Sequence, residues 1–227
     1  MTAPGDARAR VLGKIRSALG VAADGDARMQ AVRERLETHP AGLVPARAGK
    51  PKAERLALFV QMLEGQGATV VQAEDAADVP ELIAAYLREK NLPAELRSGT
   101  DALLSGMPWD RVPSLERRAG PAEAQDGASL SRAVAGAAET GTLFLTSGPE
   151  NPTTLNFLPD THIAVIQAED IGGSYEEAWD RLRARYGPRT LPRAVNMVSG
   201  PSRTADIEQT IIMGAHGPRR LHVIIVA

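Results

Sequence analysis

Residues 162–182, HIAVIQAEDIGGSYEEAWDRL, contain the pattern that decides the fold class. The first six residues contain an apolar run, residues 163–166, and have the length expected for a buried strand. From Tyr175 to Leu182, apolar residues then recur at the spacing of one helix face. A buried strand followed by an amphipathic helix predicts one unit of a parallel sheet.

The same alternation extends over the rest of the chain after residue 51, so the predicted fold class is α/β. Strands without an exposed face indicate a mostly parallel sheet that helices cover on both faces. The predicted strands are residues 68–73, 94–97, 142–146, 162–167, 194–198 and 221–226, and the predicted helices include residues 129–138 and 204–213.

The first 40 residues have helical spacing, with a thin apolar stripe among arginine and glutamate. Pro40, Pro45 and Pro51 then mark a linker or an ordered loop. We therefore predict a helical arm and linker over residues 1–50 and one α/β domain over residues 51–227. The arm is either a solvated peripheral segment or one that packs on the domain or on a partner.

Composition excludes several classes of function. The chain has 227 residues and 43% of them are hydrophobic, which suffices for a stable core without disulfide bonds or a structural metal ion. It has no cysteine, which excludes disulfides and thiolate-bound metals or iron–sulfur clusters. The net charge of -2 argues against nucleic-acid binding. No apolar run reaches membrane-spanning length and no metal-ligand spacing occurs, so we expect a cytoplasmic protein without metal or cofactor.

The segment SGPSRTADIE (199–208) is the best candidate for ligand binding. A glycine-proline turn follows a predicted strand, and a helix is expected to begin near Ser202 or Thr204. Free amides at a helix start attract anions, Gly200 permits close approach, and Arg203 offers a fork for carboxylate or phosphate. Alternatively, Ser202 or Thr204 simply caps the helix.

The segment AETGT (138–142) is a second candidate. Glu139 is a carboxylate among small residues just before a buried strand, so it could act as nucleophile or base. Gly141, between Thr140 and Thr142, has the position of the left-handed residue after a helix. The alternative is that Glu139 is a solvated residue at a helix end.

The segment GAHGPRR (214–220) turns into the last strand. His216 could serve acid–base chemistry or contact an anion, and Arg219 could add positive field. The pairing of Glu139 with His216 rests on assumed proximity. We predict that the bends at Gly141, Gly200 and Gly217 meet at one rim of the sheet. Residues 147–154 form a polar loop that could close over a ligand.

Taken together, AETGT (138–142), LPDTHIAVI (158–166), SGPSRTADIE (199–208) and GAHGPRRLHVI (214–224) resemble the lactate utilization protein C family, which carries a LUD domain. The resemblance is dense from about Ala133 to Val226. It implies a fold similar to the NagB/RpiA/CoA-transferase-like group. It also implies work with iron–sulfur partner proteins that oxidise L-lactate to pyruvate.

Three hypotheses follow. The first is a non-redox component of a lactate-oxidising assembly that binds a small carboxylate or phosphate, or a partner, through the three bends. The second is a stand-alone enzyme acting on a phosphorylated sugar, a CoA ester or a folate, with Glu139 as nucleophile or base. The third is a scaffold whose motifs only build tight turns.

Overall fold

A computed structural model describes residues 4–20, 25–205, 211–214 and 216–227. The chain divides into two units, Met1–Ala41 and Gly42–Ala227. The first contains helices α1 (Pro4–Ala18) and α2 (Gly25–Thr38), which confirms the helical prediction for this segment. Their apolar stripes remain largely exposed; for example, Val11 is 58% and Leu36 is 57% accessible.

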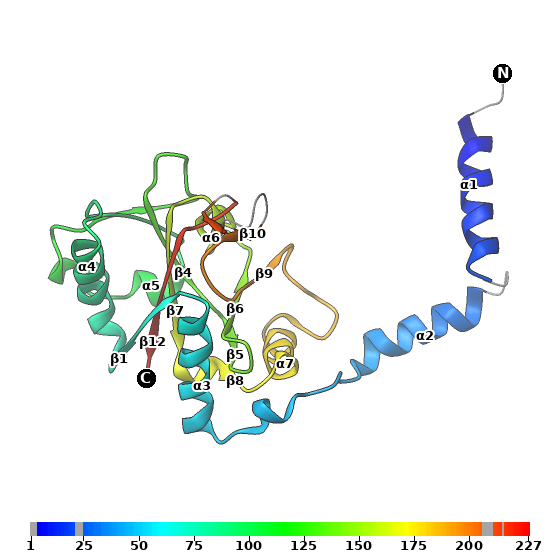
Figure 1. Ribbon diagram of the computed structural model, residues 1–227, viewed down its shortest axis with the longest axis horizontal. Helices are drawn as coiled ribbons and strands as arrows, with labels where there is room; N and C mark the ends of the chain where they lie inside the picture. Colours follow the sequence, from blue (N-terminus) through cyan, green and yellow to red (C-terminus); the bar gives the residue numbers. More distant parts are fainter. Residues whose placement is uncertain (1–3, 21–24, 206–210, 215) are drawn as a thin grey trace. The chain divides into compact units, whose positions relative to one another are not determined.

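The second unit is built on a six-stranded sheet in which every neighbouring pair of strands is parallel (Figure 1). Parallel strands need crossover connections, and the helices between them supply these. Along the sheet, the strands are β1 (Thr69–Ala73), β12 (Arg220–Val226), β7 (Thr161–Gln167), β4 (Ala128–Arg132), β2 (Glu95–Ser98) and β3 (Glu116–Ala119).

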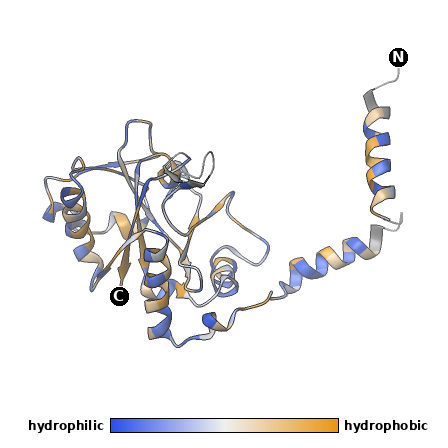
Figure 2. Cartoon of the chain, in the orientation of Figure 1, coloured by the Kyte–Doolittle hydropathy of each residue, from blue (hydrophilic) through white to orange (hydrophobic). Residues whose placement is uncertain are grey.

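The pleat of the central strands divides the core into two layers. Ile163 and Val165 of β7 pack on the side of α4 (Val79–Glu89) and α5 (Ala102–Ser105). Ala164 and Ile166 point to the opposite layer, beside α3 (Lys52–Gly65). Both faces of these strands are buried, which is why residues 163–166 are all apolar (Figure 2).

A second, four-stranded sheet covers part of the α3 side. It has the order β8 (Ile171–Gly172), β5 (Ala135–Ala137), β6 (Thr142–Thr146) and β9 (Val195–Val198). Leu143 and Leu145 of β6 join the α3 layer, whereas Phe144 faces α7 (Tyr175–Tyr186). The predicted strands at 142–146 and 194–198 are therefore correct, but they pair antiparallel in this sheet.

Two predicted helices are wrong. Residues 129–138 form most of β4 and all of β5, because their small side chains fit between layers where larger residues would not; Ala133, Ala135 and Ala137 are fully buried. The segment from 204 contains β10 (Arg203–Ala205), which pairs antiparallel with β11 (Ile211–Met213). Residues 206–210, part of the predicted helix, lie outside the described residues.

Candidate functional site

The bends at Gly200 and Gly217 open onto one pocket of about 240 Å³, here called the His162 pocket. It lies at the amino ends of β7 and β12 and at the carboxyl end of β9. The turn after β9 does not lie at the carboxyl ends of the parallel strands, because β9 belongs to the second sheet. The lining residues are Asn156, Phe157, His162, Met197, Val198, Ser199, Gly200, Ser202, His216, Gly217, Pro218 and Leu221.

Backbone contacts hold the two bends together. The Ser202 amide donates to the Pro218 carbonyl at 2.7 Å, and the Gly214 amide donates to the Ser202 carbonyl at 3.0 Å. A Cβ atom at Gly217 would lie 3.3 Å from Ser202 Cβ, and one at Gly200 would lie 2.8 Å from Gln66 Cβ. Glycine is thus required at position 200 for the close approach to the end of α3.

The floor of the pocket contains two polar side chains, Asn156 and His162, each only 1% exposed. Asn156 comes from the short helix α6 (Thr154–Phe157), and His162 is the second residue of β7. Between them, Ser131 Oγ donates to Asn156 Oδ1 at 3.1 Å and lies 2.5 Å from His162 Nε2. A hydroxyl has one proton, so Nε2 must be the donor in the second contact.

This network leaves two atoms without a partner. Asn156 Nδ2 and His162 Nδ1 are buried and form no hydrogen bond within the described structure. Since Nε2 carries the proton, Nδ1 is an acceptor, whereas Nδ2 is a donor. Burial lowers the pKa of His162 to about 4, so the imidazole is neutral at physiological pH. Two residues that line the pocket thus keep unmet hydrogen-bonding groups, a donor on Asn156 and an acceptor on His162.

Little in the sequence distinguishes these two residues as candidates for a binding site. His162 opens an apolar strand, which is typical of a core histidine with all its hydrogen bonds satisfied; here only Nε2 is satisfied. Asn156 lies in a polar loop segment without a recognisable motif. The available signal was a polar residue, His162, inside a strand that is buried on both faces.

The Gly141 bend does not line the pocket but is linked to it through hydroxyl groups. Thr142 Oγ1 lies 2.7 Å from Ser199 Oγ, 2.7 Å from Thr140 Oγ1 and 2.8 Å from Tyr175 Oη. Ser199 in turn lines the pocket. Thr142 therefore contacts a lining residue of the pocket, and Thr140 contacts Thr142.

The two predicted catalytic residues occupy different surroundings. Glu139 is 4% exposed, and its Oε1 accepts the Tyr175 amide at 2.8 Å, at the start of α7. His216 is exposed and lines the His162 pocket. No contact joins Glu139 to His216 within the described part of the chain, and the catalytic role of each remains a prediction.

Glu139 has a clear structural role, which gives a first testable prediction. A carboxylate that accepts a helix-start amide is favoured by the helix dipole and by the hydrogen bond. We expect Glu139→Ala to lower the free energy of unfolding by about 1–3 kcal/mol, and Glu139→Gln to lower it less because an amide oxygen still accepts. Urea unfolding checks this, and equal stability of Glu139→Ala and wild type would contradict it.

The remaining predicted anion-binding residues lie outside the lining of the pocket. The Arg203 guanidinium donates to the Gln66 carbonyl, and Arg219 Nε lies 3.6 Å from Asp160 Oδ2. Thr204 belongs to strand β10, so the amides near Ser202 and Thr204 are not those of a helix start. The argument for anion binding from a helix dipole therefore fails here, and a role for Arg203, Thr204 or Arg219 in binding an anion remains a prediction.

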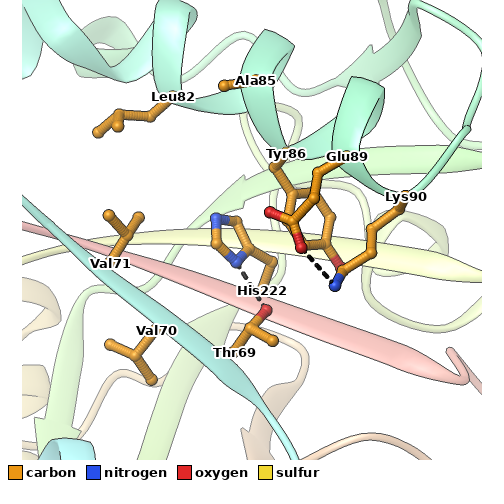
Figure 3. Close-up of a pocket in the computed structure, with 9 residues that line it drawn as sticks. All are labelled: Thr69, Val70, Val71, Leu82, Ala85, Tyr86, Glu89, Lys90 and His222. Atoms are coloured by element: carbon orange, nitrogen blue, oxygen red, sulfur yellow. Dashed lines mark hydrogen bonds and ion pairs between the residues drawn. The ribbon is translucent and has the colours of Figure 1, made fainter.

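A second pocket, of about 300 Å³, lies between α4 and the edge strand β1 (Figure 3). The His222 ring stacks on Tyr86 with centroids 3.9 Å apart, and its Nδ1 lies 2.7 Å from Thr69 Oγ1. Burial lowers the pKa of His222 to about 4 and raises that of Tyr86. Glu89 and Lys90 form an ion pair at its rim. None of the predicted site residues lines this pocket.

Comparison with known proteins places the chain in a family. The model of the LUD domain matches residues 56–226, which is most of the second unit. The chain belongs to the LUD domain family. A crystal structure of a DUF162 family protein from Deinococcus radiodurans has the same fold, with a TM-score of 0.58 and 23% identity over 78% of this chain and 99% of the other.

Curated LUD-family relatives match over shorter stretches. An uncharacterized protein of Neisseria meningitidis is 37% identical over 99 residues, covering 44% of this chain and 42% of the relative. Lactate utilization protein C of Bacillus subtilis is 34% identical over 91 residues, covering 40% and 38%. The chain thus spans about two fifths of the length of these relatives.

Two further observations bound the chemistry of this LUD-family chain. Among the described residues, no helix is long and apolar enough to cross a bilayer. Within the same residues, no group of three or more histidine, aspartate or glutamate side chains is placed to hold a metal ion.

Proposed function

We propose that this LUD-domain chain is a non-redox component of an L-lactate utilization system and that its His162 pocket holds a small 2-hydroxycarboxylate. The observation that carries the proposal is that two lining residues keep unmet groups, a donor on Asn156 and an acceptor on His162. Relatives named lactate utilization protein C support the metabolic setting.

A 2-hydroxycarboxylate complements these two unmet groups. A 2-hydroxycarboxylate carries an acceptor, the carboxylate, next to a donor, the hydroxyl. The carboxylate can accept from Asn156 Nδ2, while the hydroxyl donates to the neutral Nδ1 of His162. Ser199 and Ser202 line the same pocket and can add hydroxyl contacts. Satisfying two buried polar groups at once is favourable because each is costly when left unpaired.

The chain itself is not suited to carry electrons. It contains no cysteine, so it cannot bind an iron–sulfur cluster through thiolates. In this proposal it works in the cytoplasm with iron–sulfur partner proteins, which would take the electrons when lactate is oxidised to pyruvate. The fold relation to the NagB/RpiA/CoA-transferase-like group and the division at residue 50 belong to the same proposal.

The two alternative functions have less support. A stand-alone enzyme with Glu139 as nucleophile needs a free carboxylate, but Glu139 Oε1 is engaged with the Tyr175 amide. A scaffold without a ligand site gives no reason for two unpartnered polar atoms on the floor of a pocket.

The proposal is tested in cells that express the chain and grow on L-lactate. Tagged wild-type protein should co-purify with iron–sulfur proteins, and deletion of the gene should slow growth on L-lactate but not on glucose. Complementation with Asn156→Leu should fail to restore growth, whereas Gln61→Leu, at an exposed position of α3 outside the pocket, should restore it. Normal growth of the deletion strain on L-lactate would refute the proposal.

A further inference from the structure

A third pocket, of about 310 Å³, lies at the carboxyl end of β4, whereas the His162 pocket lies at the amino ends of β7 and β12. It is built where β4 ends at Arg132 and β6 ends at Thr146, and Asp101, just after β2, completes that wall. Ligands of open α/β sheets bind outside the carboxyl ends of the strands. The volume is at the lower end of the range for small-molecule pockets, roughly 300–1,000 Å³.

Arg132 brings unmet donors to this pocket. Its side chain is 17% exposed, and Nη2 donates to Gln167 Oε1 at 2.7 Å. It also forms ion pairs with the carboxylates of Asp101 and Asp170, each at 3.8 Å, which is too long for a hydrogen bond. The Nε atom is buried and has no partner in the described structure. The guanidinium can therefore still form a charge-assisted pair with a carboxylate.

Asn151 brings an unmet acceptor to the same pocket. The residue is 8% exposed, its Nδ2 donates to the Thr146 carbonyl at 3.2 Å, and its Oδ1 is buried without a partner. The bond to Thr146 fixes the orientation of the amide, since a flip would set two acceptors against each other. A ligand in this pocket can therefore donate a hydrogen bond to Asn151 Oδ1.

The ionic groups of the lining balance in sign. Arg132 and Arg185 are cationic, and Asp101 and Glu150 are anionic. A simple anion would meet two carboxylates, and a simple cation would meet two guanidinium groups. A ligand with a carboxylate and an ammonium group close together satisfies both signs, the donors of Arg132 and the acceptor of Asn151.

The loop that covers the pocket is held in shape before any ligand arrives. Ser147 exchanges hydrogen bonds with Ala194 in both directions, through its amide at 2.9 Å and through its Oγ at 2.8 Å. Gly148 and Asn151 are joined by a pair of backbone hydrogen bonds. A rigid loop reduces the entropy lost on binding. The polar loop predicted to close over a ligand therefore belongs to this pocket and not to the His162 pocket.

We propose that this pocket is a binding site for a free α-amino acid, with the carboxylate of the ligand on Arg132 and its ammonium group on Asn151 Oδ1 and Asp101. The site is independent of the His162 pocket, because the two pockets share no lining residue. It would let an amino acid regulate the protein or serve as a second ligand.

The test is calorimetric titration of the full chain with the common L-amino acids, one at a time, and with propionate and L-lactate as ligands that lack the ammonium group. We expect at least one amino acid to bind about tenfold or more tightly than propionate and L-lactate do in this pocket. Because L-lactate is also the proposed ligand of the His162 pocket, its titration here uses the Asn156→Leu variant.

Variants locate the binding. Arg132→Gln and Asn151→Leu should each weaken the amino acid about tenfold or more, while Asn156→Leu on the floor of the other pocket should leave it unchanged. Circular dichroism checks that each variant is folded. If Asn151→Leu does not fold, the affinity of Arg132→Gln for the amino acid tests the proposal. Absence of binding by every amino acid, or equal affinity in Arg132→Gln and wild type, would overturn the proposal.

Discussion

Replacing Gly141 with alanine should destabilise the protein by about 3 kcal/mol or more, which corresponds to a fall of roughly 10 °C in Tm. Gly141 has φ +65°, a left-handed conformation that costs an alanine about 1–2 kcal/mol. Its Cβ would also lie 2.7 Å from the Leu63 amide nitrogen in the last turn of α3. A backbone atom cannot move aside as a flexible side chain can, so the two costs add.

The matched control for Gly141→Ala is Gly65→Ala, at the end of the same helix. A Cβ there meets no atom within 4 Å, and alanine favours helix more than glycine does. Gly65→Ala should therefore leave the midpoint of thermal unfolding unchanged or raise it slightly. Comparable stability of the Gly141 and Gly65 variants would show that the bend does not pack on α3 as described.

Acid should unfold the protein in a range set by two buried histidines. Burial holds the pKa of His162 and His222 at about 4, below the ordinary value of 6.5. Between these values the unfolded chain binds protons that the folded chain does not, so stability falls as pH falls. The full contribution is present above about pH 6.5 and is lost by about pH 4. Each histidine then accounts for up to about 3 kcal/mol.

Urea unfolding at several pH values between 7.5 and 4.5 checks this acid sensitivity. Ionised carboxylates add their own pH dependence, so the informative quantity is the difference between variants. His162→Gln should lower stability at pH 7.5 but flatten its decline towards pH 4.5, whereas exposed His216→Gln should leave the decline unchanged. A decline of wild-type steepness in His162→Gln would contradict the burial of a neutral imidazole at that position.

The buried strands of this fold could be predicted because their residues form short apolar runs in the sequence. The run from 162 to 167 is apolar at every residue after His162 and before Gln167, as a strand covered on both faces must be. The alanine-rich segment from 129 to 138 was predicted wrongly, because local propensity favours helix while the narrow space between the two sheets selects small residues in strands.

Only part of the candidate site could be predicted from the sequence. Glycine-bearing turns identified the bends at Gly200 and Gly217, because glycine marks positions of close backbone approach. The floor could not be predicted, since it depends on which atoms of Asn156 and His162 find partners after folding. Nor could the sequence show that Arg203 would contact the Gln66 carbonyl, a residue 137 positions away.

The most direct measurement is a calorimetric titration of L-lactate into the wild-type chain and into Asn156→Leu, with propionate as the ligand that lacks the hydroxyl. Wild type should bind L-lactate, and both the loss of the Asn156 amide and the loss of the ligand hydroxyl should weaken binding about tenfold or more. Failure of the folded wild-type chain to bind L-lactate at millimolar concentration, or equal binding by Asn156→Leu, would contradict the assignment of the pocket.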